Sequence, residues 1–258
     1  MMLILSVLIA LTPPPGVIHH GEEILTAQEM IQLMDEASVV FVGEKHDDSL
    51  AHQWELFLWM TMASFDRFLA LEMFETDVQE VLEDYLAGKL TLEEFLEGSR
   101  PWGNYIEDYH PLVEYAALNG YGVIAANVPR RYAAAVARNG WEGLSGIEGG
   151  DVFLSTDVDS TNESYRERFM ATMEAISSQM QSMPMDPSNM YRAQLLKDAV
   201  MASSITGQSC LFICGSFHSD ERSGIPDQLE SGVTYLTVKI IGEDEPWDAD
   251  QADFVIVR

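Results

Sequence analysis

Cysteine and basic side chains are scarce in this chain. Its 258 residues include two cysteines, and 14 lysines and arginines stand against 42 acidic residues, which gives a formal net charge of −28. So few cations cannot neutralise many phosphates, and we therefore expect no nucleic acid among the partners of this protein. Strong acidity favours solubility and carries no information about the fold.

The two cysteines, Cys210 and Cys214, lie in an apolar segment that is typical of a strand. A strand separates residues at this spacing by roughly 13 Å, which is beyond the reach of a disulfide. We therefore predict that both are core residues, and they do not reveal the redox compartment.

Two motifs of common enzyme classes are also missing. There is no G-x-S-x-G sequence, and Ser216 stands in CGSFH instead, so a serine nucleophile is not expected. There is no H-E-x-x-H sequence, so no single helix supplies a pair of metal-binding histidines. A metal site would therefore need ligands from separate strand ends.

An apolar run, MMLILSVLIALT, occupies the first twelve residues and is followed by PPPG. It is short for a bilayer span and suits a signal peptide, although a basic start and an A-x-A cleavage site are missing. No cysteine follows it, which excludes a lipoprotein anchor. We predict a leader over residues 1–20 and an exported, periplasmic or envelope-associated protein. The alternatives are a misassigned start and a membrane-surface anchor.

Apolar residues make up 47% of the chain and aromatic residues 10%, as in a globular protein with a substantial core. The length suits one large α/β domain, which we place at residues 21–258. Short apolar runs bounded by glycine and charged residues predict buried strands at 39–43, 68–73, 121–126, 209–214, 233–241 and 254–257. The alternating pattern of 233–241 favours an edge or antiparallel strand.

Helical spacing and capping signals predict helices at 27–37, 49–64, 163–180 and 189–206, and one that begins at Pro129. The acidic segment 76–119 is predicted to be a helical insertion after the strand at 68–73. Segment 140–160 is predicted to be a loop with one short strand at 152–155. The aromatic turn of the insertion either walls a pocket for a flat ligand or belongs to the core; it comprises Trp102, Tyr105, Tyr109 and His110.

Ionisable side chains follow three of the predicted strands. Glu44 and His46 come directly after 39–43, Glu72 ends 68–73, and His218 follows 209–214; both histidines stand in G-x-x-H sequences. Ligands of open α/β sheets bind at the carboxyl ends of strands. Two carboxylates and two imidazoles can bind Zn²⁺ or Mn²⁺ or act as acid and base. The alternative is a buried polar network that holds the strand ends together.

Helix 49–64 and the helix after Pro129 add three further candidates. His52 is predicted either to point back to the strand end or to be a half-buried helix residue with its polar groups satisfied. Arg130 and Arg131 oppose the dipole of a helix N-terminus and therefore need an anionic partner. Carboxylates of Glu44 or Glu72 are the structural answer, and a carboxylate or phosphate of a ligand is the functional one.

Six segments, in this order, resemble the ChaN-like proteins: GEKHDDSLAHQ, LALEMFE, the AGKLTLEEFL…PWGNY…YHPLVEYA block, AANVPRRY, AQLLKDAVMA and GSFHSD. These are bacterial haem-binding uptake proteins related to the Tiki, TraB and erythromycin-esterase groups. The resemblance covers nearly all of 39–229. It implies a single α/β domain with a central mixed, mostly parallel sheet, helices on both faces and a helical insertion.

The resemblance also implies haem bound through a tyrosine between two protomers, and hence a homodimer, with export or membrane association in some members. A C-x-x-C-H sequence is absent, so any haem is bound non-covalently. Many ChaN-like sequences carry a histidine-bearing segment before the AQ-x-x-K-D helix. This chain has SMPMDPSNMY there, which leaves Tyr191, Met183 and Met185 as local ligand candidates.

The first functional hypothesis is haem binding for iron acquisition. It requires an apolar slot, an axial ligand, and cations for the propionates. We expect Tyr191, and after it Tyr132, as the axial ligand, and Arg130 and Arg131 as the cations.

The second hypothesis is a hydrolase. The wider superfamily shares paired G-x-x-H sequences and a strand-end glutamate, which carry metal-dependent proteolysis or histidine-based ester hydrolysis in the related groups. The matching positions here are Glu44, His46, Glu72 and His218. The sequence leaves open whether the site holds a porphyrin, a divalent metal such as Zn or Mn, or a reacting bond.

Overall fold

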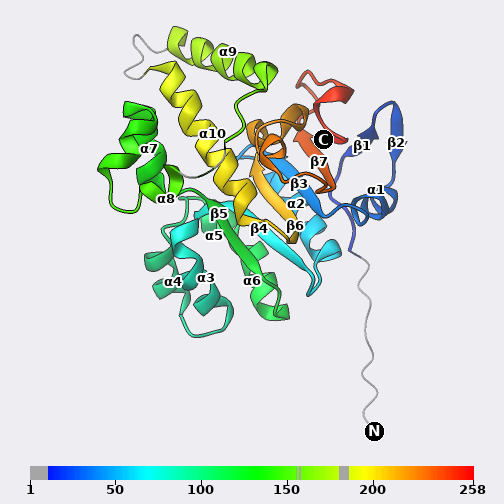
Figure 1. Ribbon diagram of the computed structural model, residues 1–258. Coiled ribbons are helices and arrows are strands. Elements are labelled where there is room, and N and C mark those ends of the chain that lie inside the picture. The colour runs from blue at the N-terminus through cyan, green and yellow to red at the C-terminus, as the bar shows by residue number, and fades with distance from the viewer. Residues whose placement is uncertain (1–10, 155, 157, 180–185) are drawn as a thin grey trace.

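The centre of the structure is a sheet with the strand order β2-β1-β8-β7-β3-β6-β4-β5 (Figure 1). The computed structural model describes residues 11–154, 156, 158–179 and 186–258. Strands β3 to β8 pair in parallel, and β1 pairs antiparallel with both β2 and β8. The strands are β1 (Val17–His20), β2 (Glu23–Leu25), β3 (Val39–Glu44), β4 (Arg67–Glu75), β5 (Val123–Asn127), β6 (Ser209–Gly215), β7 (Tyr235–Ile241) and β8 (Phe254–Val257).

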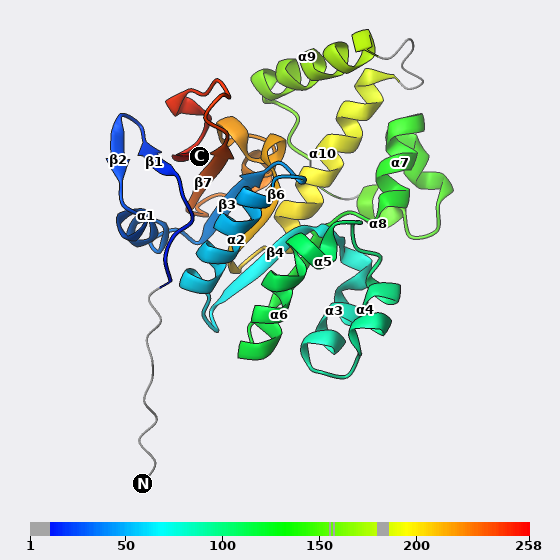
Figure 2. The ribbon, with the colours of Figure 1, turned by 180° about the vertical axis from the view of Figure 1, so that it is seen from behind.

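Helices cover both faces of this sheet, as Figure 2 shows from behind. One face packs against α1 (Ala27–Met34), α2 (Ser49–Met62), α3 (Gln79–Leu86), α4 (Leu92–Ser99), α5 (Tyr105–Asp108) and α6 (His110–Asn119). The other face packs against α10 (Pro187–Ser204), around which lie α7 (Arg130–Asn139), α8 (Asp151–Leu154) and α9 (Glu163–Gln179). The predicted fold class is confirmed.

Short 3₁₀ turns link several of these elements. They are η1 (Thr76–Val78), η2 (Trp141–Gly146), η3 (Ser216–His218), η4 (Asp220–Arg222), η5 (Pro226–Gln228) and η6 (Ala249–Gln251).

The alternation of side chains along β3 divides them between the two faces. Val40 and Val42 belong to the core under α2, whereas Val39 and Phe41 belong to the core under α10. A strand that is buried on both faces is apolar throughout, which is why the run VVFV identified it. Cys210 and Cys214 on β6 are free and buried, as predicted.

The helical insertion lies between β4 and β5, as the sequence predicts. Thr91 caps α4 through a reciprocal capping box with Glu94, and Gly120 ends α6 in the left-handed region at φ 73°. The rings of Tyr105 and Tyr109 are buried in the core.

The prediction of an edge or antiparallel strand at 233–241 is wrong. Strand β7 lies inside the sheet, parallel to β3 and to β8. Its polar side chains are paired rather than solvated: Lys239 forms an ion pair with Asp220, and Thr237 exchanges hydrogen bonds with Asp253. The alternation of apolar and polar residues along β7 therefore reflects polar side chains that are paired on one face of an interior strand.

The prediction of a strand at 152–155 is also wrong, because Asp151–Leu154 form the helix α8. The amides of Phe153 and Leu154 both donate to the Gly150 carbonyl, which closes a helical turn. Ser155 lies outside the described residues.

The hairpin of β1 and β2 was not expected from the sequence. Its strand β1 includes the last residues of the predicted leader, and Val17 pairs with Val257 at the end of β8. The leader itself stays a prediction. Among the described residues, the helices are too short or too polar to cross a bilayer.

Candidate functional site

The carboxyl ends of β3, β6 and β4 lie side by side, because these strands are neighbours in the sheet. Glu44 pairs in register with Gly215, whose amide donates to Glu72 Oε2 at 2.8 Å. The pleat nevertheless sends the two carboxylates to opposite faces: Glu44 continues the row of Val42 under α2, and Glu72 continues the row of Ala70 under α10. The predicted residues therefore form two clusters.

The first cluster, which we call the Glu72 cluster, comprises Glu72, His218, Asp198 and Tyr165. His218 Nε2 lies 3.3 Å from Glu72 Oε1, and His218 Nδ1 donates to Asp198, which also accepts from the Tyr165 hydroxyl at 2.6 Å. Burial by itself lowers the pKa of His218, but the charges of Glu72 and Asp198 raise it to about 10. His218 is therefore an imidazolium held between two buried carboxylates.

The second cluster, which we call the Glu44 cluster, comprises Glu44, His46, His52, Glu55 and Tyr109. Glu44 Oε1 accepts from His46 Nδ1 at 2.9 Å and from the Tyr109 hydroxyl. His52 Nδ1 lies 2.9 Å from Glu55 Oε2 and 3.1 Å from Glu44 Oε2. His52 thus points back to the strand end, and it is buried rather than half-buried.

Electrostatics in the Glu44 cluster favour one proton on its carboxylates. Burial and the neighbouring charge of Glu44 raise the pKa of Glu55 well above its ordinary value. Burial opposes ionisation of Glu44, but hydrogen bonds from His46 and other neighbours hold its pKa below the ordinary value. Burial lowers the pKa of His52, whereas the hydrogen bond to Glu55 and nearby negative charges raise it to about 9.

His46 is the member of these clusters that reaches solvent, with its side chain 46% exposed. Its ring packs edge-on against Trp102 at a centroid distance of 4.4 Å. A Cβ on Gly215 would lie 3.0 Å from His46 Cε1 and 3.6 Å from Glu72 Oε2, so the glycine is needed for this close approach. The Glu44–His46 pair is arranged as a general base with an oriented imidazole.

A small cavity of about 120 Å³ lies beside Glu72. Two cations, Arg130 and Lys197, contribute to its wall. The remaining lining residues are Met73, Glu75, Trp102, Asn127, Val128 and Ala133. Of these, Trp102 also packs against His46.

The structural partners predicted for Arg130 and Arg131 are wrong. Arg130 Nε lies 3.7 Å from Glu75, and Arg131 Nη1 donates to Asp77 at 2.6 Å, so neither pairs with Glu44 or Glu72. The reason is that both carboxylates are buried beside histidines, His46 and His218, whereas the two arginines lie near the surface. Both guanidinium groups are at least half exposed.

Tyr132 is buried, and its hydroxyl donates to the Glu148 carbonyl at 2.9 Å. Its ring contacts Phe153 at a centroid distance of 4.6 Å, and the Arg131 guanidinium lies over it at 4.4 Å. The hydroxyl of Tyr132 is thus engaged within the protein.

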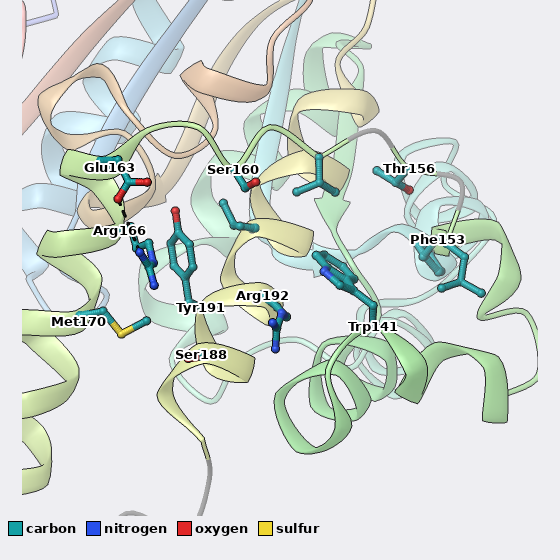
Figure 3. A pocket seen from close by; sticks show the side chains of 13 residues that line it. Trp141, Phe153, Thr156, Ser160, Glu163, Arg166, Met170, Ser188, Tyr191 and Arg192 are labelled. Atoms are coloured by element: carbon teal, nitrogen blue, oxygen red, sulfur yellow. Dashed lines mark ion pairs between the residues drawn. The ribbon is translucent and has the colours of Figure 1, made fainter.

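A larger cavity of about 560 Å³ lies between α8, α9 and α10 (Figure 3). Its volume is within the range of small-molecule pockets, roughly 300–1,000 Å³. The aromatic and aliphatic residues of its wall are Trp141, Phe153, Leu154, Val158, Met170 and Leu195. The residues with polar groups are Thr156, Ser160, Glu163, Arg166, Ser188, Tyr191 and Arg192. In the view of Figure 3, the Tyr191 ring lies between Arg166 and Arg192.

Tyr191 is the predicted site residue that reaches this cavity. Its side chain is buried, and its hydroxyl has no hydrogen-bond partner within the described chain. Arg166 lies 3.6 Å from Glu163, whereas Arg192 donates to the neutral amide oxygen of Asn189 at 2.6 Å. Met183 and Met185 lie outside the described residues.

Sequence reasoning missed several residues of these sites. Glu55 follows His52 at the i, i+3 spacing of a helix face, and that spacing is a signal that was present in the sequence. Asp198 stands in the AQ-x-x-K-D sequence, so a signal for it was present in the chain. Arg166 and Arg192 lie on helices without a motif around them, and only the fold brings them to the cavity.

The family model described as haem-binding uptake, Tiki superfamily, ChaN matches residues 30–229. The chain belongs to this family. Comparison with curated proteins gives no match.

Among solved structures, a member of the ChaN family shares the fold. This structure, described as "Cofacial heme binding to ChaN of Campylobacter jejuni", is 20% identical, with a TM-score of 0.73 over 93% of this chain and 96% of that one. The type III effector HopBA1 is 11% identical, with a TM-score of 0.46 over 88% and 90% of the two chains. A Bacillus cereus protein is 12% identical, with a TM-score of 0.47 over 87% and 73%.

For this member of the ChaN family, the two functional hypotheses fall on different places in the structure. The haem hypothesis concerns the residues of the Tyr191 cavity. The hydrolase hypothesis concerns His46 and the other residues at the strand ends. The described His, Cys, Asp and Glu side chains bring three ligand atoms within 4.8 Å of one another at Glu44, His52 and Glu55. The metal set predicted from Glu44, His46, Glu72 and His218 stays a prediction.

Proposed function

We propose that this chain binds haem non-covalently in the Tyr191 cavity and serves haem or iron uptake. The observation that carries the proposal is the buried Tyr191 hydroxyl, which lines a cavity of about 560 Å³ without a hydrogen-bond partner in the described structure. A buried hydroxyl without a partner costs free energy, and a ligand atom removes that cost. Membership of the ChaN family supports the same ligand.

The lining of the cavity supports the proposal on each of the three requirements of a haem site. Trp141, Phe153 and Met170 offer apolar surface for the porphyrin face. Tyr191 offers the phenol oxygen that ligates ferric haem in some proteins. Arg192 and Arg166 offer guanidinium groups for the two propionates, and the overall acidity of the chain makes such local cations necessary.

Burial and the charge of Asp198 raise the pKa of Tyr191 to about 12. The hydroxyl therefore keeps its proton at neutral pH until a metal ion displaces it. Tyr191 would hold ferric haem through its phenol oxygen, and this oxygen would lose its proton on binding, since a ligand atom must be deprotonated to coordinate a metal.

We further propose that haem is shared between two protomers and that the protein is exported. Cofacial haem binding is described for the Campylobacter jejuni ChaN, and this supports a paired arrangement. Analytical ultracentrifugation with and without hemin tests the dimer, and fractionation of the native host tests export.

A hemin titration of the full chain tests the proposal. We expect saturable binding with a shifted Soret band in the wild type, and loss of the tyrosinate charge-transfer band together with weaker binding in Tyr191→Phe. Tyr132→Phe is the matched control, because its hydroxyl bonds a backbone carbonyl away from the cavity. Absence of a saturable shift, or equal spectra for wild type and Tyr191→Phe, would falsify the proposed site.

A second candidate function is favoured by one observation: the half-exposed His46 imidazole is held by the buried Glu44 carboxylate. This pair can activate a water for ester or peptide hydrolysis. A panel of esters and peptides assayed with wild type and His46→Ala decides it. Equal rates in the two proteins eliminate the hydrolase.

A further inference from the structure

Helix α2 brings two ionisable side chains under the end of β3. The helix begins at Asp48, whose side chain accepts from the amides of Leu50 and Ala51. His52 and Glu55 then lie one turn apart on the same face, and that face meets Glu44. All three side chains are at least nine-tenths buried.

Two oxygens of this group accept no hydrogen bond from the described residues, although His52 Nδ1 lies 3.1 Å from one of them, Glu44 Oε2. Glu44 Oε2 and Glu55 Oε1 accept no hydrogen bond within the described chain, although both atoms are buried. The other carboxylate oxygens are engaged, Glu44 Oε1 by His46 and Tyr109 and Glu55 Oε2 by His52. A positive charge between two buried carboxylates with free oxygens offsets the cost of burying their negative charges.

The orientation of His52 is that of a metal-binding imidazole. Its Nε2 lies 3.3 Å from the His46 carbonyl and 3.5 Å from Asp108 Oδ2. These oxygens are placed to accept a hydrogen bond from a protonated Nε2. Its Nδ1 faces the two carboxylates. Metal-bound histidines regularly donate their second ring nitrogen to a carbonyl or carboxylate in this way.

We propose that Glu44, His52 and Glu55 bind a divalent transition-metal cation between β3 and α2. One ligand atom from each residue lies within 4.8 Å of the other two. Two carboxylates carry two negative charges, which a divalent cation cancels. The imidazole nitrogen favours Zn²⁺ or Mn²⁺ over Ca²⁺ and Mg²⁺, which prefer all-oxygen sites.

The site is independent of the Tyr191 cavity, which lies under α9 and α10 on the other face of the sheet. A bound cation joins α2 to the end of β3 and, through Glu44, fixes the imidazole of His46.

Metal content of the full chain tests the proposal. The protein is stripped with a chelator, loaded with Co²⁺ or Zn²⁺, passed through a desalting column in high salt to remove surface ions, and analysed by mass spectrometry. We expect one retained ion per chain, and visible Co²⁺ bands of the intensity that a nitrogen-containing, low-coordinate site gives. A wild type that retains no ion overturns the proposal, and a proton alone then occupies the site.

Two isosteric variants identify the ligands. Glu55→Gln is expected to weaken retention by about tenfold or more, whereas Glu72→Gln, a buried carboxylate on the opposite face, retains the ion. If Glu72→Gln loses the ion and Glu55→Gln retains it, the metal is bound by the strand-end residues around Glu72. This result overturns the proposal. If Glu55→Gln does not fold, the stoichiometry and Co²⁺ spectrum of the wild type still decide whether the ion binds.

Discussion

Tyr191 on α10 and Tyr165 on α9 have rings in contact, with a centroid distance of 6.0 Å, yet their hydroxyls differ. Tyr165 donates to the buried Asp198, and burial and that carboxylate raise its pKa far above the ordinary value. The hydroxyl of Tyr191 has no such partner among the described residues, and Tyr191 lines the cavity. At the scale of residues, it is this difference that separates a structural tyrosine from a candidate ligand.

The cavity arginines give a prediction about haem affinity. Arg192→Gln and Arg166→Gln each remove one charged donor for a propionate, so we expect the Kd for hemin to rise by about five- to tenfold. Arg131→Gln is the control, because this arginine pairs with Asp77 outside the cavity. Titration followed at the Soret band measures all three. A larger effect of Arg131→Gln instead supports the propionate role that the sequence suggested.

His218 gives a prediction about pH. Its pKa is raised from 6.5 to about 10 in the folded protein, so the stabilisation is complete below pH 6.5 and is lost as the pH rises towards 10. We expect the urea midpoint of the wild type to fall over this interval and that of His218→Gln to be lower but flatter. His110→Gln, which leaves the Glu72 cluster intact, is the control. Parallel pH profiles for His218→Gln and wild type contradict the assignment.

At the scale of elements, α10 positions both Tyr191 and Asp198 and packs against α7 and the sheet. Leu196 on its α7-facing side is fully buried. Leu196→Ala is expected to lower the free energy of unfolding by about 2–5 kcal/mol.

Leu118→Ala on α6 is the matched control, because Leu118 is 79% exposed and its truncation is expected to cost less than about 0.5 kcal/mol. Urea unfolding of both variants measures the difference. Similar free energies for the two would mean that α10 is not anchored through Leu196.

The sequence predicts most elements of this fold, because β3, β4 and β6 are apolar runs bounded by glycine or charged residues. It does not predict β7 as an interior strand, because the pairing of Lys239 with Asp220 depends on a turn that is remote in the chain. Nor does it predict α8, a single turn that the Gly150 carbonyl begins.

The sequence predicts where the candidate site lies, but it does not predict that the site is divided into two clusters. Four strand-end residues were expected together, and they do reach the same edge of the sheet. Their separation into two clusters follows from the pleat and from the register of β3 and β4 on β6, in which Phe41 and Ala70 both pair with Phe212. That register is a tertiary property, so Glu44 and Glu72 could not be assigned to opposite faces from the sequence.

At the scale of the whole molecule, the net charge of −28 gives a prediction about salt. Mutual repulsion of acidic groups destabilises the compact state, and salt screens it. We expect the Tm at neutral pH to rise by roughly 2–4 °C or more between about 20 mM and about 0.5 M NaCl. The rise is expected to shrink at about pH 5, where protonation lowers the charge. A Tm that is constant or falls with salt refutes this account.

The order of strands in the sheet has a consequence for synthesis of the chain. Strand β1 pairs with β2 on one edge but with β8 on the other, and β3 lies between β6 and β7, so β1 and β3 are fully paired only after most of the chain exists. Such non-local pairing slows folding and leaves apolar strands such as β3 exposed in the meantime. The nascent chain is therefore expected to keep β3 unpaired, and to depend on chaperones that cover this apolar strand, until β6 and β7 are made.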